Sequence, residues 1–228
     1  MGEVIRSNAA AEDIEADILE TARNAAARGG EIAAAAETRL GPAVEAIGSS
    51  KALLGAAQLA DSLAWAPVEV ENGKSDKEIG KVRDEMWNAL GRPKDHPAMN
   101  AAIPGGIKTY TEGDIKDQPP LMGVFATRIR ATAAPMWSEA AREAWATGIT
   151  VRGGALEAVL AAHAPHAAAE TVAAAGYRSA IRNGHAKLVM FKRDLFNLGL
   201  TETQAHEIIP DAETRPAKKK PADDEPKK

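Results

Sequence analysis

The stretch 92–118 carries several side chains suited to proton transfer, from which we select His96, Tyr110 and Asp114. A histidine close to a carboxylate is a common arrangement for general acid–base catalysis, so these three are the candidate catalytic residues. Any solvated loop also carries polar residues of these types. Contact with a partner protein is therefore the favoured role of the stretch, and Ile107 and Tyr110 are the residues expected to make that contact.

The histidines and the one phosphate-loop fragment give little support to a bound metal or nucleotide. His163 and His166 are three residues apart, but no pattern of carboxylates accompanies them, and the chain has no cysteine to supply a thiolate ligand. Gly73-Lys74-Ser75 matches the end of a Walker A motif, yet the position of its first glycine is occupied by Val68. We therefore expect no cofactor and no metal.

A basic segment covers residues 176–198 and is the second candidate for an interaction surface. It contains five basic residues and one acid, and we select Arg178, Arg182, Lys192 and Arg193 as its contact residues. Nucleic-acid binding is one function that such a segment permits. The helix expected after it carries Glu202 and Glu207 and no base, which disfavours reading of a DNA groove.

Helices must position all of these residues, because apolar side chains recur at intervals of three and four along most of the chain. The clearest stripe is Leu188, Phe191, Leu195 and Leu198, and a second one is formed by Ile79, Val82, Met86 and Leu90. Capping boxes at 75–78 and 201–204 predict two helix starts. Glycine and proline predict kinks or ends in the helices, at 41–42, 48–50, 67–73, 148, 153–154 and 165.

The stretch 92–118 differs from its surroundings because it is rich in proline and glycine. We expect a long central loop there, in which the strand-forming residues 107–111 suggest a short β-arm. The resulting division is a helical half at 1–91, the loop at 92–118, a second helical half at 119–210 and a flexible charged tail at 211–228.

Composition indicates how these helices pack. The chain of 228 residues contains 49 alanines, whereas Leu, Ile, Val and Phe together number 41, and the net charge is −4. Alanine favours the helix but buries little area, so helices must approach closely or associate between copies to gain stability. The fold class that follows is all-α: an alanine-rich helical bundle with a long Pro/Gly-rich central loop and a disordered C-terminal tail.

These observations favour a non-enzymatic structural or protein-interaction component that associates with itself through alanine-faced helices, with a protein partner or a second copy as its ligand. One alternative is an enzyme or small-ligand binder whose pocket is formed by the 92–118 loop against the helices. The other is nucleic-acid binding through 176–198. No signal peptide and no membrane span is expected, which predicts a location in the cytoplasm or in a particle assembled there.

Overall fold

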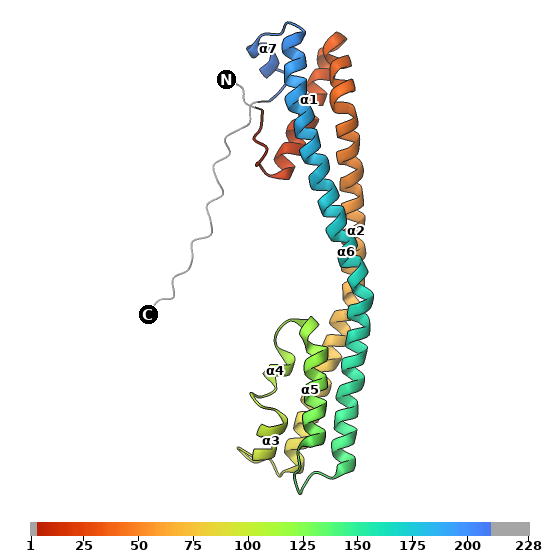
Figure 1. The fold of residues 1–228 in the computed structure, drawn as a ribbon, viewed down its shortest axis with the longest axis vertical. Helices are drawn as coiled ribbons and strands as arrows, with labels where there is room; N and C mark the ends of the chain where they lie inside the picture. The colour runs from red at the N-terminus through yellow and green to blue at the C-terminus, as the bar shows by residue number, and fades with distance from the viewer. Residues whose placement is uncertain (1–3, 211–228) are drawn as a thin grey trace, which may run out of the picture. The chain divides into compact units, whose positions relative to one another are not determined.

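The computed structural model describes residues 4–210, and the fold is all-α: every regular element in this range is a helix (Figure 1). Two long helices, α2 (Gly30–Ala89) and α6 (Glu139–Asn197), contribute to both of two compact units. Of the described residues, unit 1 contains 4–54 and 173–210, and unit 2 contains Gly55–Val172. Residues 1–91 and 119–210 therefore each supply part of both units.

Unit 1 packs α1 (Ala11–Arg28) and α7 (Glu202–His206) against its portions of α2 and α6. Its core is built from apolar side chains that are less than 5% exposed, namely Ile14, Ile18, Leu40, Ile47, Ile181, Leu188, Phe191, Leu195, Ile208 and Ile209. The turn between α1 and α2 is made by Gly29 and Gly30, which both have positive φ angles of 73° and 58°. Only glycine adopts such angles at little cost, so this pair sets the reversal of the chain.

A close approach inside unit 1 depends on Gly184 of α6. A Cβ atom at this position would lie 2.8 Å from Cδ1 of Ile18 and 3.0 Å from Cδ1 of Ile47. Both isoleucines are fully buried, so any shift of their end methyl groups has to be accommodated by the surrounding core. The absence of a side chain at 184 therefore lets α6 contact α1 and α2 at the same level.

Unit 2 packs α3 (Pro97–Ala102), α4 (Lys108–Thr111), the 3-10 turn η1 (Ile115–Asp117) and α5 (Gln118–Ala131) with its portions of α2 and α6. Figure 1 shows α3, α4 and α5 gathered beside one end of these portions. The centre of the core is aromatic and aliphatic, with Met86, Phe125, Ile129, Trp137, Trp145 and Ile149 among its members. The Trp137 and Trp145 rings meet edge to face at 5.7 Å.

The helix ends predicted inside the two long helices are wrong. No helix ends at 41–42, 48–50, 67–73, 148, 153–154 or 165, and α6 continues through Pro165. Ser75 is an interior helical residue, so its capping box is also wrong. Inside a helix a glycine costs about 1 kcal/mol and a proline about 3 kcal/mol, and the packing of the buried residues elsewhere on each long helix outweighs these costs. The capping box at Thr201–Gln204 is confirmed, since it begins α7.

The predicted β-arm is wrong as well. Residues 108–111 form the helical turn α4, and the stretch 92–118 folds into α3, α4 and η1 rather than into one irregular loop. Burial explains the difference, because Ala102, Ile103 and Tyr110 belong to the core of unit 2. The predicted tail, 211–228, lies outside the described residues. Within residues 4–210 no helix is both long and apolar enough to cross a membrane.

Candidate interaction surfaces

Two of the three candidate catalytic side chains cap helices. The imidazole Nδ1 of His96 accepts a hydrogen bond of 3.1 Å from the Ala98 amide and so begins α3. The carboxylate of Asp114 accepts one of 3.0 Å from the Lys116 amide at the start of η1. Each side chain satisfies a backbone N–H that would otherwise lack a partner. Their placement is therefore explained by local structure.

The third candidate, Tyr110, is buried. Its ring stacks on Phe125 at 4.8 Å, and its hydroxyl oxygen accepts a hydrogen bond of 2.8 Å from Arg128. Among the described residues no hydrogen bond or ion pair joins Tyr110 to His96 or Asp114. A buried ring is not available to a partner, so of the two contact residues proposed in this stretch only Ile107 remains partly exposed.

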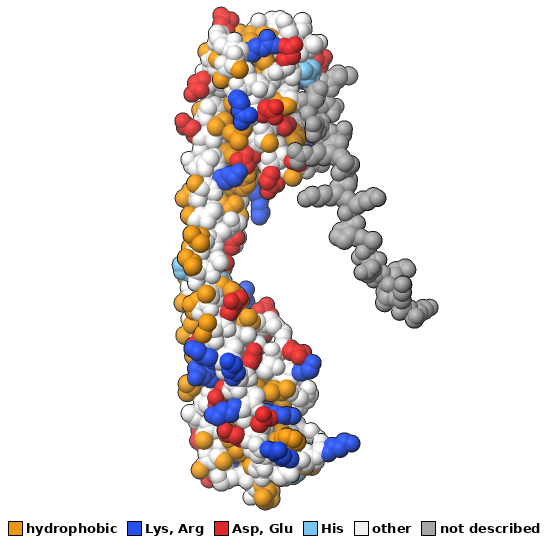
Figure 2. Space-filling model, turned by 180° about the vertical axis from the view of Figure 1, so that it is seen from behind, with side chains coloured by type: hydrophobic (Ala, Val, Ile, Leu, Met, Phe, Trp, Pro, Cys, Tyr) orange, Lys and Arg blue, Asp and Glu red, His pale blue; other side chains and the backbone are white. Residues whose placement is uncertain are grey.

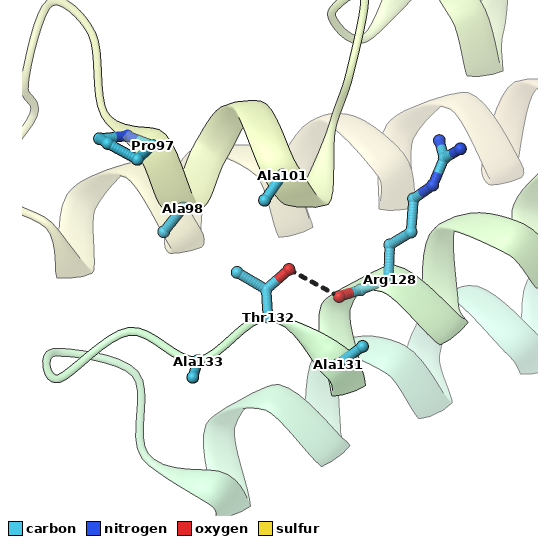
Figure 3. Close-up of a pocket in the computed structure, with 7 residues that line it drawn as sticks. All are labelled: Pro97, Ala98, Ala101, Arg128, Ala131, Thr132 and Ala133. Carbon is cyan, nitrogen blue, oxygen red and sulfur yellow. Dashed lines mark hydrogen bonds between the residues drawn. The ribbon is translucent and has the colours of Figure 1, made fainter.

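A small hollow lies between α3 and the end of α5 (Figure 3). Its volume is about 400 Å³, and it is lined by Pro97, Ala98, Ala101, Arg128, Ala131, Thr132 and Ala133. The Thr132 hydroxyl donates to the Arg128 carbonyl at 2.8 Å, and the Arg128 guanidinium donates to Tyr110. The hollow can therefore hold an apolar group, and its lining contains no carboxylate, histidine, lysine or cysteine side chain that could act as a general base.

The basic segment forms an exposed face on α6 of unit 1. Arg178, Arg182 and Arg193 are exposed and form no ion pair with any acidic residue of the described range, whereas Lys192 is half-buried with its ammonium 5.9 Å from the centre of the Phe196 ring. The one acid of the segment, Asp194, is paired with Arg39 at 2.8 Å. This pairing occupies the one acid of the segment, while Arg178, Arg182 and Arg193 face the solvent.

A buried polar contact holds α1 to α6 in unit 1. The Tyr177 hydroxyl donates to Glu15 at 2.6 Å, and the Lys51 ammonium lies 2.9 Å from the same carboxylate. Burial raises the pKa of Glu15, but the hydrogen bond from Tyr177 and the charge of Lys51 outweigh it, so that the pKa lies below its ordinary value. Glu15 therefore remains ionised at neutral pH.

A second polar contact joins α2 to α6 in unit 2. Nε2 of His163 lies 2.8 Å from a carboxylate oxygen of Asp61, and the imidazole meets the Trp65 ring at 4.9 Å. His163 is 8% exposed, so it belongs to the helix interface. Among the described residues no group of three or more His, Cys, Asp or Glu side chains is placed to hold a metal ion.

The feature that sequence reasoning missed is a pair of exposed apolar surfaces on α2 and α6 of unit 2. Large side chains that are more than half exposed lie on both helices: Leu59, Leu63, Val70, Val151 and Val172. The signal was present in the spacing of residues 56, 59, 63, 66 and 70, but the break expected at 67–73 concealed it. Figure 2 shows hydrophobic side chains along the two long helices of unit 2.

No protein-family model, no curated protein sequence and no solved structure matches this chain.

Proposed function

We propose that this protein is a non-enzymatic structural or interaction component that associates with itself through apolar helix surfaces. The observation that carries the proposal is the exposure of the two helices in unit 2. Between residues 55 and 72 of α2 only Val68 is buried, and between 154 and 172 of α6 only Leu156 and His163 are buried.

In unit 2, α2 and α6 carry apolar side chains that no other described part of the chain covers. Soluble monomers rarely keep a large contiguous apolar surface, because covering it with another apolar surface is favourable. Fully burying one Leu or Val side chain contributes about 1.5–3 kcal/mol, and five such side chains here are more than half exposed. The chemistry of the remaining surfaces supports the same proposal, since the candidate catalytic side chains already have structural partners.

The experiment is sedimentation velocity with light scattering on the full chain over a hundredfold range of concentration. We expect the mean mass to rise above the 23.9 kDa of one chain as the concentration increases. A mass that stays at one chain over the whole range would refute self-association.

The arginine face supports a second candidate, the binding of a polyanion such as nucleic acid. Arg178, Arg182 and Arg193 have no acidic partner in residues 4–210, and cations of this kind neutralise phosphates. We expect retention of a labelled oligonucleotide at low salt that falls steeply with added salt, and a loss of that retention when Arg178 and Arg182 are replaced by alanine. Lys77→Ala, an exposed change in unit 2, is the control. An oligonucleotide that is not retained at low salt would exclude this candidate.

A further inference from the structure

The exposed apolar residues of α2 in unit 2 form a ridge with a regular spacing. It consists of Ala56, Leu59, Leu63, Ala66 and Val70, at alternating steps of three and four residues, and every one of them is exposed. Leu59 and Leu63 are 63% and 67% exposed and form its centre. Steps of three and four are the pattern by which one helix packs lengthwise on another.

A row of small exposed residues runs along α6 in the same unit, and we call this row the groove. It consists of Gly154, Ala158, Ala161, Pro165 and Ala168, again exposed and again at steps of three and four. Its side chains are small, whereas the centre of the ridge is large. Each surface covers 14 residue steps, or about 21 Å of helix. None of the ten residues that form the ridge and the groove is charged, so the two rows themselves bring no charge into the contact.

One chain cannot bring its own ridge onto its own groove. Asp61 and Val68 face α6, and at about 100° per residue the ridge lies on the opposite side of α2. Leu156 and His163 face α2, and the groove lies on the opposite side of α6 by the same rotation. The two surfaces therefore point away from each other, and each needs a different molecule to cover it.

We propose that the ridge on α2 of one copy packs into the groove on α6 of a second copy, an inference that rests on the proposed self-association and specifies its contact. Small residues allow two helix axes to approach to about 8 Å, and the Leu59 and Leu63 side chains then fill the spaces between them. Two ridges in contact would hold the helices further apart. Two grooves in contact would leave no large side chain to fill the gap.

The size of the contact determines its strength and the form of the assembly. A strip about 21 Å long and about 10 Å wide covers roughly 200 Å² per partner, against about 800 Å² per partner in a stable complex. A single contact is therefore weak, and association must depend on concentration. Because the ridge and the groove are different surfaces, the contact does not close within a pair of copies. Each copy uses both surfaces, so the assembly grows into chains or rings.

Disulfide trapping tests this contact directly, because the native chain has no cysteine. Leu63→Cys and Ala161→Cys are prepared separately, one of them with a tag that changes its mass, and are mixed at high concentration with oxidised glutathione. Gln58→Cys, on an exposed polar position of α2, is the control. We expect the mixed Leu63→Cys/Ala161→Cys dimer to form at least fivefold faster than either homodimer or any pairing with the control.

Each other outcome contradicts the proposed contact. A dominant Leu63→Cys homodimer would mean that two ridges meet, and no pairing above the control would mean that neither surface is used. Light scattering of the unmodified chain tests self-association independently of the contact. If the chain assembles but the ridge–groove pair does not form, only the proposed contact is refuted. In the same assay Leu63→Glu is expected to abolish association, whereas Ser62→Glu, on the neighbouring exposed polar position, is expected to retain it.

Discussion

Replacement of Gly184 by alanine tests how closely the helices of unit 1 approach one another. The added methyl carbon would lie 2.8 Å from Cδ1 of Ile18 and 3.0 Å from Cδ1 of Ile47, distances well inside van der Waals contact. Both isoleucines are buried, so relief requires strained rotamers or a shift of α6. Inserting one methyl into a well-packed core costs about 1–3 kcal/mol.

The same substitution also removes a glycine from a helix, which stabilises by about 1 kcal/mol. Gly176→Ala is the matched control, because Gly176 lies on the same helix, is exposed and has no atom within 4 Å of an added Cβ. We expect Gly176→Ala to raise the free energy of unfolding by about 0.5–1 kcal/mol. Gly184→Ala should lie about 1–3 kcal/mol below that control, because only it carries the packing cost.

Urea unfolding followed by circular dichroism at 222 nm measures this difference. Equal stability of the two variants within about 0.5 kcal/mol would refute the close approach at Gly184. All four tryptophans lie within residues 55–172 of unit 2, whereas Gly184 lies in unit 1. Tryptophan fluorescence therefore reports separately on the unit that the substitution does not touch. Hydrogen exchange of α1 amides should accelerate in Gly184→Ala and not in Gly176→Ala.

Two further predictions concern carboxylates with shifted pKa values. Tyr177→Phe removes the hydrogen bond to Glu15 and should cost about 1–3 kcal/mol at pH 7, measured by urea unfolding. Because the pKa of Glu15 is lowered in the folded state from 4.5, its contribution is present above that value and is lost as the pH falls through the folded pKa. The wild type should therefore lose stability more steeply than Tyr177→Phe between pH 5 and about 3, and parallel curves would contradict this. Burial raises the pKa of Asp76, because the charged carboxylate is poorly solvated there. The stability that this group provides is therefore lost as the pH rises through its folded pKa. Asp76→Asn removes the charge and should raise the melting temperature at pH 7 but not at pH 4. A gain of the same size at both pH values would show that the charge of Asp76 is not the cause.

Periodicity predicted the class of fold and much of the core. Leu188, Phe191 and Leu195 are fully buried, as their stripe predicts, and so are Ile79 and Met86. Leu198 continues the first stripe but is 38% exposed, because α6 ends at Asn197 and the chain changes direction there. In these two stripes the predicted burial holds as far as the helix continues.

The candidate sites were less predictable because they depend on exposure. His96, Asp114 and Tyr110 were selected for their chemical types, yet two of them cap short helices and the third is in the core of unit 2. Nothing local to a side chain shows whether another helix will cover it. The same limit applies to Leu59 and Leu63, whose apolar character suggests burial although both are exposed.

By itself, then, the amino-acid sequence determined that this chain is helical, because alanine content and three–four spacing act within a few residues of one another. Only the tertiary structure decided where the helices end, since glycine and proline inside α2 and α6 are tolerated when buried residues on both sides hold the helix together. It also decided which apolar faces remain uncovered. Both outcomes depend on contacts between segments far apart in the chain, such as Asp61 with His163 and Glu15 with Tyr177, and these contacts leave no local pattern to read.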